Sequence, residues 1–139
     1  MTPQPRRTAR RFAAAFVAGA LAFLALDAVW LTLMAPRLYR PNIGHLMRAD
    51  FDPLAALAFY IIYFTGMVYF VVLPADGARS AAWRGAFFGL VTYATYDLTN
   101  QATMRGWSWT VTLADLAWGA FVTAVACAIA QRASAALQR

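Results

Sequence analysis

Four long apolar stretches, separated by short polar segments, dominate the hydrophobic pattern of this chain. They run over residues 12–34, 54–73, 83–103 and 107–130. Each is close to the roughly 20 apolar residues that an α-helix needs to cross a bilayer. Proline or glycine lies in each connection, where helices tend to end. The pattern therefore predicts an all-α fold, a polytopic antiparallel bundle of four transmembrane helices.

The composition agrees with a membrane location. The 139 residues are 62% hydrophobic and 13% charged, whereas soluble domains carry about 25% charged residues. This balance argues against a water-soluble globule and against a disordered chain. Cys127 is the only cysteine and His45 the only histidine, so we expect no disulfide within the chain and no metal site built from cysteine or histidine. The sequence has no Gly-rich phosphate loop and no zinc-binding helix motif, and we expect no metal and no cofactor.

The arginines predict the orientation of the bundle. Eight of the twelve lie on one side: six in the two terminal tails, residues 1–11 and 132–139, Arg79 in the connection between the second and third stretches, and Arg84 at the start of the third stretch. The other connections hold four. The positive-inside rule therefore places both termini in the cytoplasm. Because the arginines flank apolar stretches, we expect contact with membrane lipid and none with nucleic acid. The first stretch resumes after Asp27, so we expect a retained helix rather than a cleaved signal peptide.

The connection over residues 35–53 is long and mixed in character. Apolar and aromatic residues alternate there with arginine and histidine. Two interpretations stand equal: an amphipathic segment lying at the membrane interface, and an ordinary structured loop.

Three of the apolar stretches each contain one aspartate. Asp27 lies fifteen residues from the start of the first stretch, or about 22 Å along a helix. Asp97 lies fourteen residues into the third, about 21 Å from the same side. Asp115 lies eight residues into the fourth, about 12 Å from the opposite side. All three therefore fall in one layer, in the outer half of a core of about 30 Å.

Polar neighbours accompany this layer. Tyr60 reaches the same level on the second stretch, and Tyr96 and Asn100 share a helical face with the third-stretch aspartate. Arg37 and Arg105, near the outer helix ends, are expected to reach down and pair with the acids. A carboxylate facing lipid costs about 2.5–3.5 kcal/mol, so the aspartates should point into the bundle. Two interpretations remain: interhelical hydrogen bonding, and a pocket that opens toward the outer face.

Two further patterns concern packing. Small residues four apart, Ala15 with Gly19 and Gly85 with Gly89, predict close helix contacts in the cytoplasmic half. Tryptophans near the helix ends are expected to be interfacial anchors, namely Trp83, Trp107 and Trp109.

Four motifs carry a resemblance to a known family. They are LDAVWL at 26–31, the tyrosine-rich turn at 60–63, YDLTN at 96–100 and DLAW at 115–118. Together they resemble a family of small bacterial four-helix membrane proteins that is defined as a domain of unknown function. The similarity covers residues 12–130. It implies a bacterial inner-membrane location and four spans, and it implies no activity.

From these residues we expect binding or transport of a cation, a proton or a small polar solute. The ligand or proton would bind at Asp27, Asp97, Asp115, Tyr60, Tyr96 and Asn100. Since four helices enclose little volume, a permeation path predicts a homo-oligomer. One alternative is a membrane-embedded enzyme acting on a lipid or isoprenoid, with an aspartate as general acid or base. The other is a non-catalytic assembly subunit.

Overall fold

A computed structural model of the protein describes residues 5–138. Four long helices form most of it: α1 (Pro5–Met34), α3 (Pro53–Met67), α4 (Ala78–Thr103) and α5 (Trp109–Ala136). Shorter helical segments follow α1 and α3: η1 (Ala35–Tyr39), α2 (Arg40–Ile43), η2 (Gly44–Leu46) and η3 (Val68–Val72). The described part of the chain contains no strand, and the predicted all-α membrane fold is confirmed.

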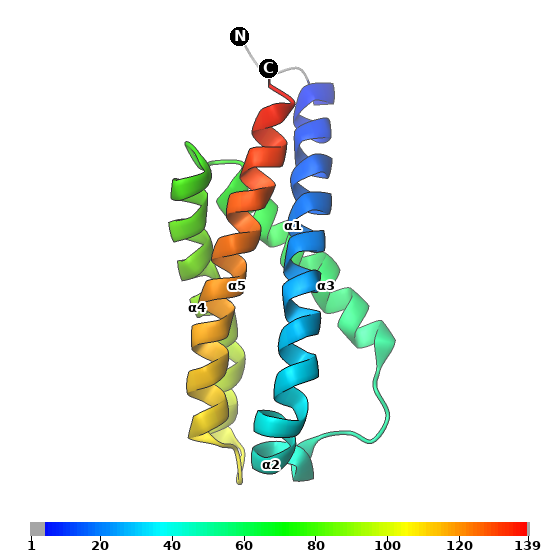
Figure 1. The fold of residues 1–139 in the computed structure, drawn as a ribbon, viewed down its shortest axis with the longest axis vertical. Coiled ribbons are helices and arrows are strands. Elements are labelled where there is room, and N and C mark those ends of the chain that lie inside the picture. Colours follow the sequence, from blue (N-terminus) through cyan, green and yellow to red (C-terminus); the bar gives the residue numbers. More distant parts are fainter. Residues whose placement is uncertain (1–4, 139) are drawn as a thin grey trace.

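Three of the long helices run along the length of the bundle, and the fourth crosses them. Helix α5 packs against both α4 and α1, while α3 makes fewer contacts with the other helices. Figure 1 shows α3 passing obliquely across the bundle, with its first turns standing away from the other helices. The start of α1 and the end of α5 lie at the same end of the molecule (Figure 1). This topology agrees with the predicted common side for both termini.

Within residues 5–138, three helical stretches are long and apolar enough to cross a membrane. They are Arg6–Leu46, Pro53–Val72 and Trp109–Ala136. Helix α4 has 26 residues, about 39 Å, so it is long enough, but it is less apolar than the others. Its role as the fourth span is supported by its extensive packing along α5 and stays a prediction.

The helices extend farther than the apolar stretches. Helix α1 begins at Pro5 and α5 continues to Ala136, so much of the expected tails, residues 1–11 and 132–139, is helical. Arginine side chains can reach water while the backbone continues as a helix, and charge at a span end therefore does not end the helix. Residues 1–4 and 139 lie outside the described part.

Small residues allow α4 and α5 to pack closely, as their spacing predicts. A methyl group on Gly85 would lie 2.8 Å from the Cys127 Sγ atom. One on Gly89 would overlap the carbonyl group of Gly119. Gly19 of α1 is similarly crowded, since a methyl group there would lie 2.6 Å from the terminal carbon of Met67. These contacts fill the half of the bundle nearer the termini.

The first connection is a structured, inward-packed segment. Ile43, Trp107 and Val111 form a small second core, against which Leu38, Tyr39 and Leu46 pack. The expectation that Trp107 is an interfacial anchor is wrong: 9% of it is exposed, and its Nε1 donates to Thr112 Oγ1 at 3.0 Å. The indole packs inward because the connection folds back over it. Trp83 and Trp109 are exposed, as an anchor requires.

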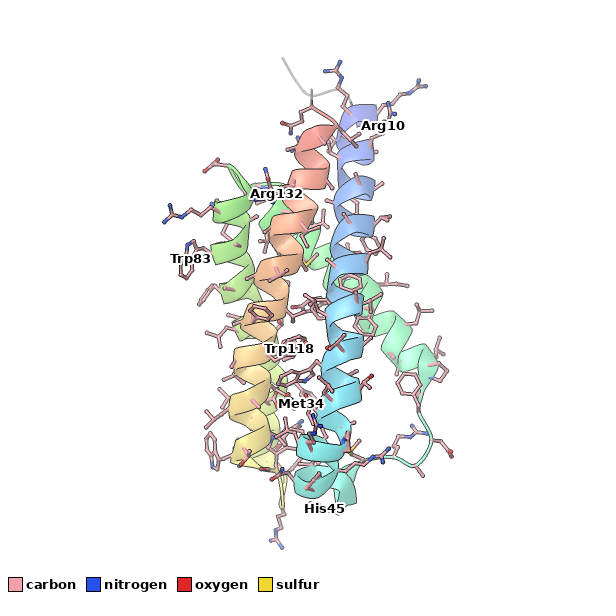
Figure 2. All side chains as sticks on the ribbon, viewed as in Figure 1. Arg10, Met34, His45, Trp83, Trp118 and Arg132 are labelled. Carbon is pink, nitrogen blue, oxygen red and sulfur yellow. The ribbon has the colours of Figure 1, made fainter. Side chains whose placement is uncertain are left out.

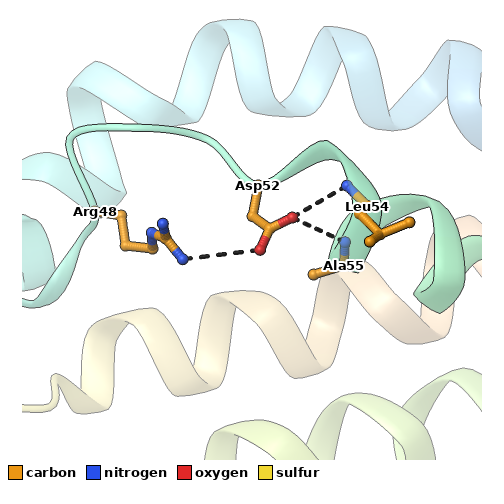
Figure 3. Close-up of polar contacts among 4 residues, drawn as sticks. All are labelled: Arg48, Asp52, Leu54 and Ala55. Atoms are coloured by element: carbon orange, nitrogen blue, oxygen red, sulfur yellow. Dashed lines mark hydrogen bonds and ion pairs between the residues drawn. The ribbon is translucent and has the colours of Figure 1, made fainter.

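Helix α3 starts at a side-chain cap. Asp52 Oδ1 accepts hydrogen bonds from the backbone N–H groups of Leu54 and Ala55, each at 3.1 Å. Arg48 lies 3.8 Å from the other carboxylate oxygen (Figure 3). The cap satisfies two amides that have no partner within the helix, and it fixes the point where the loop ends and α3 begins.

Candidate functional site

The three aspartates predicted to share a layer all lie inside the bundle. The exposed fractions are 8% for Asp27 on α1, 0% for Asp97 on α4 and 7% for Asp115 on α5. Trp118, one helical turn after Asp115, lies between the arginine-bearing end of the bundle and the end that carries Met34 and His45 (Figure 2). The surroundings of the three carboxyl groups differ, however, and they divide the predicted site in two.

Asp27 has a hydrogen-bond donor for each of its carboxylate oxygens. Tyr60 of α3 donates to Oδ2 at 2.8 Å, and the Trp118 indole of α5 donates to Oδ1 at 3.2 Å. The Trp118 ring also stacks on Trp30 of α1, with centroids 4.4 Å apart and planes 8° from parallel. One carboxyl group therefore ties α1 to two neighbouring helices.

Among the described residues, Asp115 has one hydrogen-bond donor, which comes from η1, directly after α1. The Tyr39 hydroxyl in η1 donates to Asp115 Oδ1 at 2.5 Å, and it accepts from the Trp30 indole at 2.8 Å. The relay joins three elements and orients the carboxyl group. The Asp115 carboxyl group lines the same cavity as that of Asp97.

Asp97 is the exception among the buried acids. The side chain is fully buried, and neither carboxyl oxygen has a hydrogen-bond partner among the described residues. Its near neighbour is another carboxyl group, Asp115, which has no hydrogen to donate while it is ionised. A buried polar atom without a partner costs about 1–3 kcal/mol. Asp97 is therefore the group in the bundle that most needs a proton or a cation.

A cavity of about 420 Å³ adjoins this pair of acids. We call it the acidic cavity; it lies between α3, α4 and α5 and is lined by Phe59, Tyr63, Thr92, Tyr93, Tyr96, Asp97 and Asp115. Apart from the two acids and Thr92, the lining is aromatic. Its volume falls within the range of about 300–1,000 Å³ that small-molecule pockets have.

A second cavity of about 630 Å³ lies beneath the first connection. We call it the loop cavity; it lies between residues 43–52 and the end of α4 that carries Asn100 and Met104. Tyr96 lines both cavities. The ring packs edge-on against Trp107 at 5.6 Å, and 60% of the residue is exposed. Tyr96 therefore lines both cavities and Asn100 the loop cavity alone, whereas the Tyr60 hydroxyl binds Asp27.

Two expected ion pairs do not form. Arg37 and Arg105 are exposed, and neither pairs with an aspartate within residues 5–138. Exposure explains the correction, because a guanidinium group that stays in water avoids the cost of burial. The described residues also hold no cluster of three acidic, histidine or cysteine side chains that would suit a metal ion.

Two residues of the site escaped the sequence reasoning. Tyr39 belongs to the outer connection in sequence, yet its hydroxyl binds Asp115. Phe59 has no polar group that would indicate a binding role in the sequence, yet it lines the cavity that adjoins the two acids. The only available signal was the aromatic FYIIY run at 59–63, which is too common in membrane helices to be specific.

Comparison with known proteins gives a family and no activity. The family described as "Predicted membrane protein (DUF2177)" matches residues 12–131, which is most of the chain. The chain belongs to the DUF2177 family. That match includes all three buried aspartates and both cavities, so the site lies within the DUF2177 domain. Searches of curated proteins and of solved structures gave no match.

Proposed function

We propose that this DUF2177 protein binds a cation or a proton between Asp97 and Asp115 and carries it across the inner membrane of a bacterium. A single observation supports the proposal most strongly. Asp97 is fully buried, both its oxygens lack a partner among the described residues, and it lies beside a second carboxyl group at a cavity. Intramembrane acids in such positions are typical of ion and proton pathways.

The chemistry of the pair favours a positively charged ligand. Two carboxylates side by side repel each other, and burial penalises both charges. A proton shared between Asp97 and Asp115, or a cation bound between them, removes both penalties. Tyr39 donates a hydrogen bond to Asp115 and none to Asp97, so Asp97 is the acid that still lacks a hydrogen-bond donor. An anion would add to the repulsion and is disfavoured.

Within this proposal the other predicted site residues have different roles. Asp27 and Tyr60 hold α1 against α3, because their hydrogen bond leaves the carboxylate satisfied. Tyr96 and Asn100 line the loop cavity, which would form the entrance. With the termini in the cytoplasm, as the arginines predict, this entrance faces the outside.

Passage to the cytoplasmic side requires a rearrangement or a second copy of the chain. The half of the bundle near the termini is closed by the contacts of Gly85 and Gly89 with α5. We therefore propose a homo-oligomer, or a movement of α3, whose outer half is exposed and makes few contacts. Membrane lipid would cover the remaining apolar surface.

The test is flux in vesicles. Purified protein is reconstituted into liposomes, and uptake of protons, Na⁺ and K⁺ is measured for the wild type and for Asp97→Asn/Asp115→Asn. The asparagines keep the side-chain volume and remove the charge. We expect flux to be lost in this variant and retained in Asp76→Asn, a change at an exposed loop position. Equal flux in a folded double variant would refute the proposal.

A second function is favoured by the aromatic walls of the acidic cavity. Phe59 and Tyr93 would suit an apolar chain, so a membrane-embedded enzyme acting on a lipid or isoprenoid is the alternative, with Asp97 or Asp115 as general acid or base. A covalently changed lipid, found by mass spectrometry after incubation with wild type and not with the double asparagine variant, would favour the enzyme. A third candidate, an assembly subunit, predicts that these changes alter partner capture alone.

A further inference from the structure

The walls of the acidic cavity indicate which class of cation it would hold. Four aromatic side chains, from Phe59, Tyr63, Tyr93 and Tyr96, line it together with the two acids. Aromatic rings attract cations through the negative charge of their faces, with a contribution that grows when water is excluded. An acidic pair within aromatic walls is a setting suited to a positive charge that carries apolar groups.

The same lining is poor for a bare metal ion. Ions such as Ca²⁺ and Mg²⁺ take about six or more oxygen ligands. Beyond the two aspartates, several hydroxyls of the cavity are already engaged. Tyr63 bonds Thr123 Oγ1 at 2.6 Å, and Thr92 donates to the Phe88 and Gly89 carbonyls at 2.9 and 3.1 Å. An inorganic ion would have to keep most of its water in an aromatic cavity.

The size of the cavity also exceeds what a small ion requires. A volume of about 420 Å³ leaves room for several carbon substituents around a charged centre. The loop cavity, which shares Tyr96 with it, is larger and has Asp50 and Asp52 in its lining. Both acids would attract a cation at the entrance, although Arg48 partly offsets them.

We propose that the natural ligand is a hydrophobic organic cation, an amine or a quaternary ammonium ion with apolar substituents. Its nitrogen lies against the Asp115 carboxyl group and its substituents contact Phe59 and Tyr93. The Asp97 carboxyl group, which is fully buried in the structure, turns toward the nitrogen on binding. The inference rests on the proposed function, since it names the ligand class of the same acidic pair. It adds that the aromatic walls contribute to affinity and that small inorganic cations are poor ligands.

The test uses tetrapropylammonium chloride as the probe and the full-length protein in detergent. Binding is measured by calorimetry and compared with that of NaCl, KCl and sodium propanesulfonate, an anion with an apolar chain. We expect the wild type to bind tetrapropylammonium and none of the other three. Asp97→Asn/Asp115→Asn should weaken binding by about 30-fold or more, as loss of a buried charge partner does.

The aromatic contribution is tested with matched variants on exposed positions. Phe59→Leu changes a wall of the acidic cavity, whereas Phe87→Leu changes an exposed phenylalanine of α4 that lies outside it. We expect Phe59→Leu to weaken binding by about 2- to 30-fold and Phe87→Leu to leave it unchanged. Both positions are exposed, so both variants should fold, and they keep the test decisive if the double asparagine variant does not.

The outcomes separate this inference from the function beneath it. Flux of protons or K⁺ that depends on Asp97 and Asp115, without tetrapropylammonium binding, overturns the ligand class and leaves the acidic pair as the site. Binding that is equal in Phe59→Leu and Phe87→Leu overturns the role of the aromatic walls. If both binding and flux are unchanged in Asp97→Asn/Asp115→Asn, both proposals are overturned.

Discussion

Two buried aspartates in this bundle have opposite surroundings. Asp27 receives one hydrogen bond on each oxygen, from Tyr60 and Trp118. Asp97 is buried more completely and receives none from the described residues. Burial alone therefore does not distinguish an acid that holds helices together from one available to a ligand. The number of hydrogen-bond donors around the acid distinguishes the two cases, because a carboxylate that already accepts hydrogen bonds from the protein gains little from a cation.

The largest expected effect tests this contrast directly. Asp27→Leu leaves the Tyr60 hydroxyl and the Trp118 indole without their acceptor, and each stranded donor costs about 1–3 kcal/mol. Asp97→Leu removes two oxygens that have no partner, so we expect unchanged or increased stability. Thermal unfolding in detergent, followed by tryptophan fluorescence, measures both. Equal losses of stability in the two variants would show that the contrast is false.

The next effect concerns the packing that holds Asp97 against Asp115. Gly89→Ala places a methyl group against the Gly119 carbonyl, a backbone group that cannot turn aside. Overpacking of this kind costs about 1–3 kcal/mol. Gly66→Ala is the matched control, since its methyl group would meet Phe88 at an ordinary 3.5 Å. The difference in melting temperature between the two variants checks the prediction, and a stable Gly89→Ala would contradict it.

A smaller effect separates the two tyrosines that the sequence assigned to one site. Tyr60→Phe removes a hydrogen bond to Asp27, and we expect a loss of about 1 kcal/mol. Tyr96→Phe removes a hydroxyl that, among residues 5–138, bonds none of the three buried aspartates, so its stability should match that of wild type. Chemical denaturation of both variants provides the measurement. A larger loss for Tyr96→Phe would place its hydroxyl in the hydrogen-bonding network.

The smallest effect concerns the start of α3. Asp52→Ala removes the cap on the Leu54 and Ala55 amides, with an expected cost of about 0.5–1 kcal/mol. Arg48→Ala breaks only an exposed ion pair, 3.8 Å long, which contributes little. Thermal unfolding of both single variants distinguishes the contribution of the cap from that of the ion pair. If Arg48→Ala lowers stability more than Asp52→Ala does, the cap is not what holds the start of α3.

The sequence predicted the features that depend on local periodicity. Long apolar runs predicted the helices, and the cost of charge in lipid predicted that Asp27, Asp97 and Asp115 turn inward. The small residues at Gly85 and Gly89 predicted the close contact of α4 and α5. Each of these follows from helix geometry and from the properties of the bilayer, which act in the same way whatever the neighbouring helices are.

The features that depend on three-dimensional neighbours escaped prediction. Depth along a helix placed the acids in one layer, but it does not specify which donor meets which oxygen. The Tyr39 hydroxyl reaches Asp115 only because η1 and α2 fold back toward α5. The burial of Trp107 depends on Ile43, which is far away in sequence, so its position near a helix end indicates an anchor that the fold does not make. The oblique course of α3 likewise has no signature in its uniform hydrophobicity.

The wide helical turn at Ala35–Tyr39 makes the length of this segment critical. Its closing bond joins the Arg40 amide to the Ala35 carbonyl, five residues back rather than four. Such a turn accommodates one residue more than an ordinary helix turn. Deleting a single residue here would restore the regular winding of the helix. Tyr39 would then rotate away from its acceptor, Asp115, even if all the other side chains of the segment were kept. Among natural variants of this protein, insertions and deletions in this turn should therefore be rarer than exchanges of one amino acid for another.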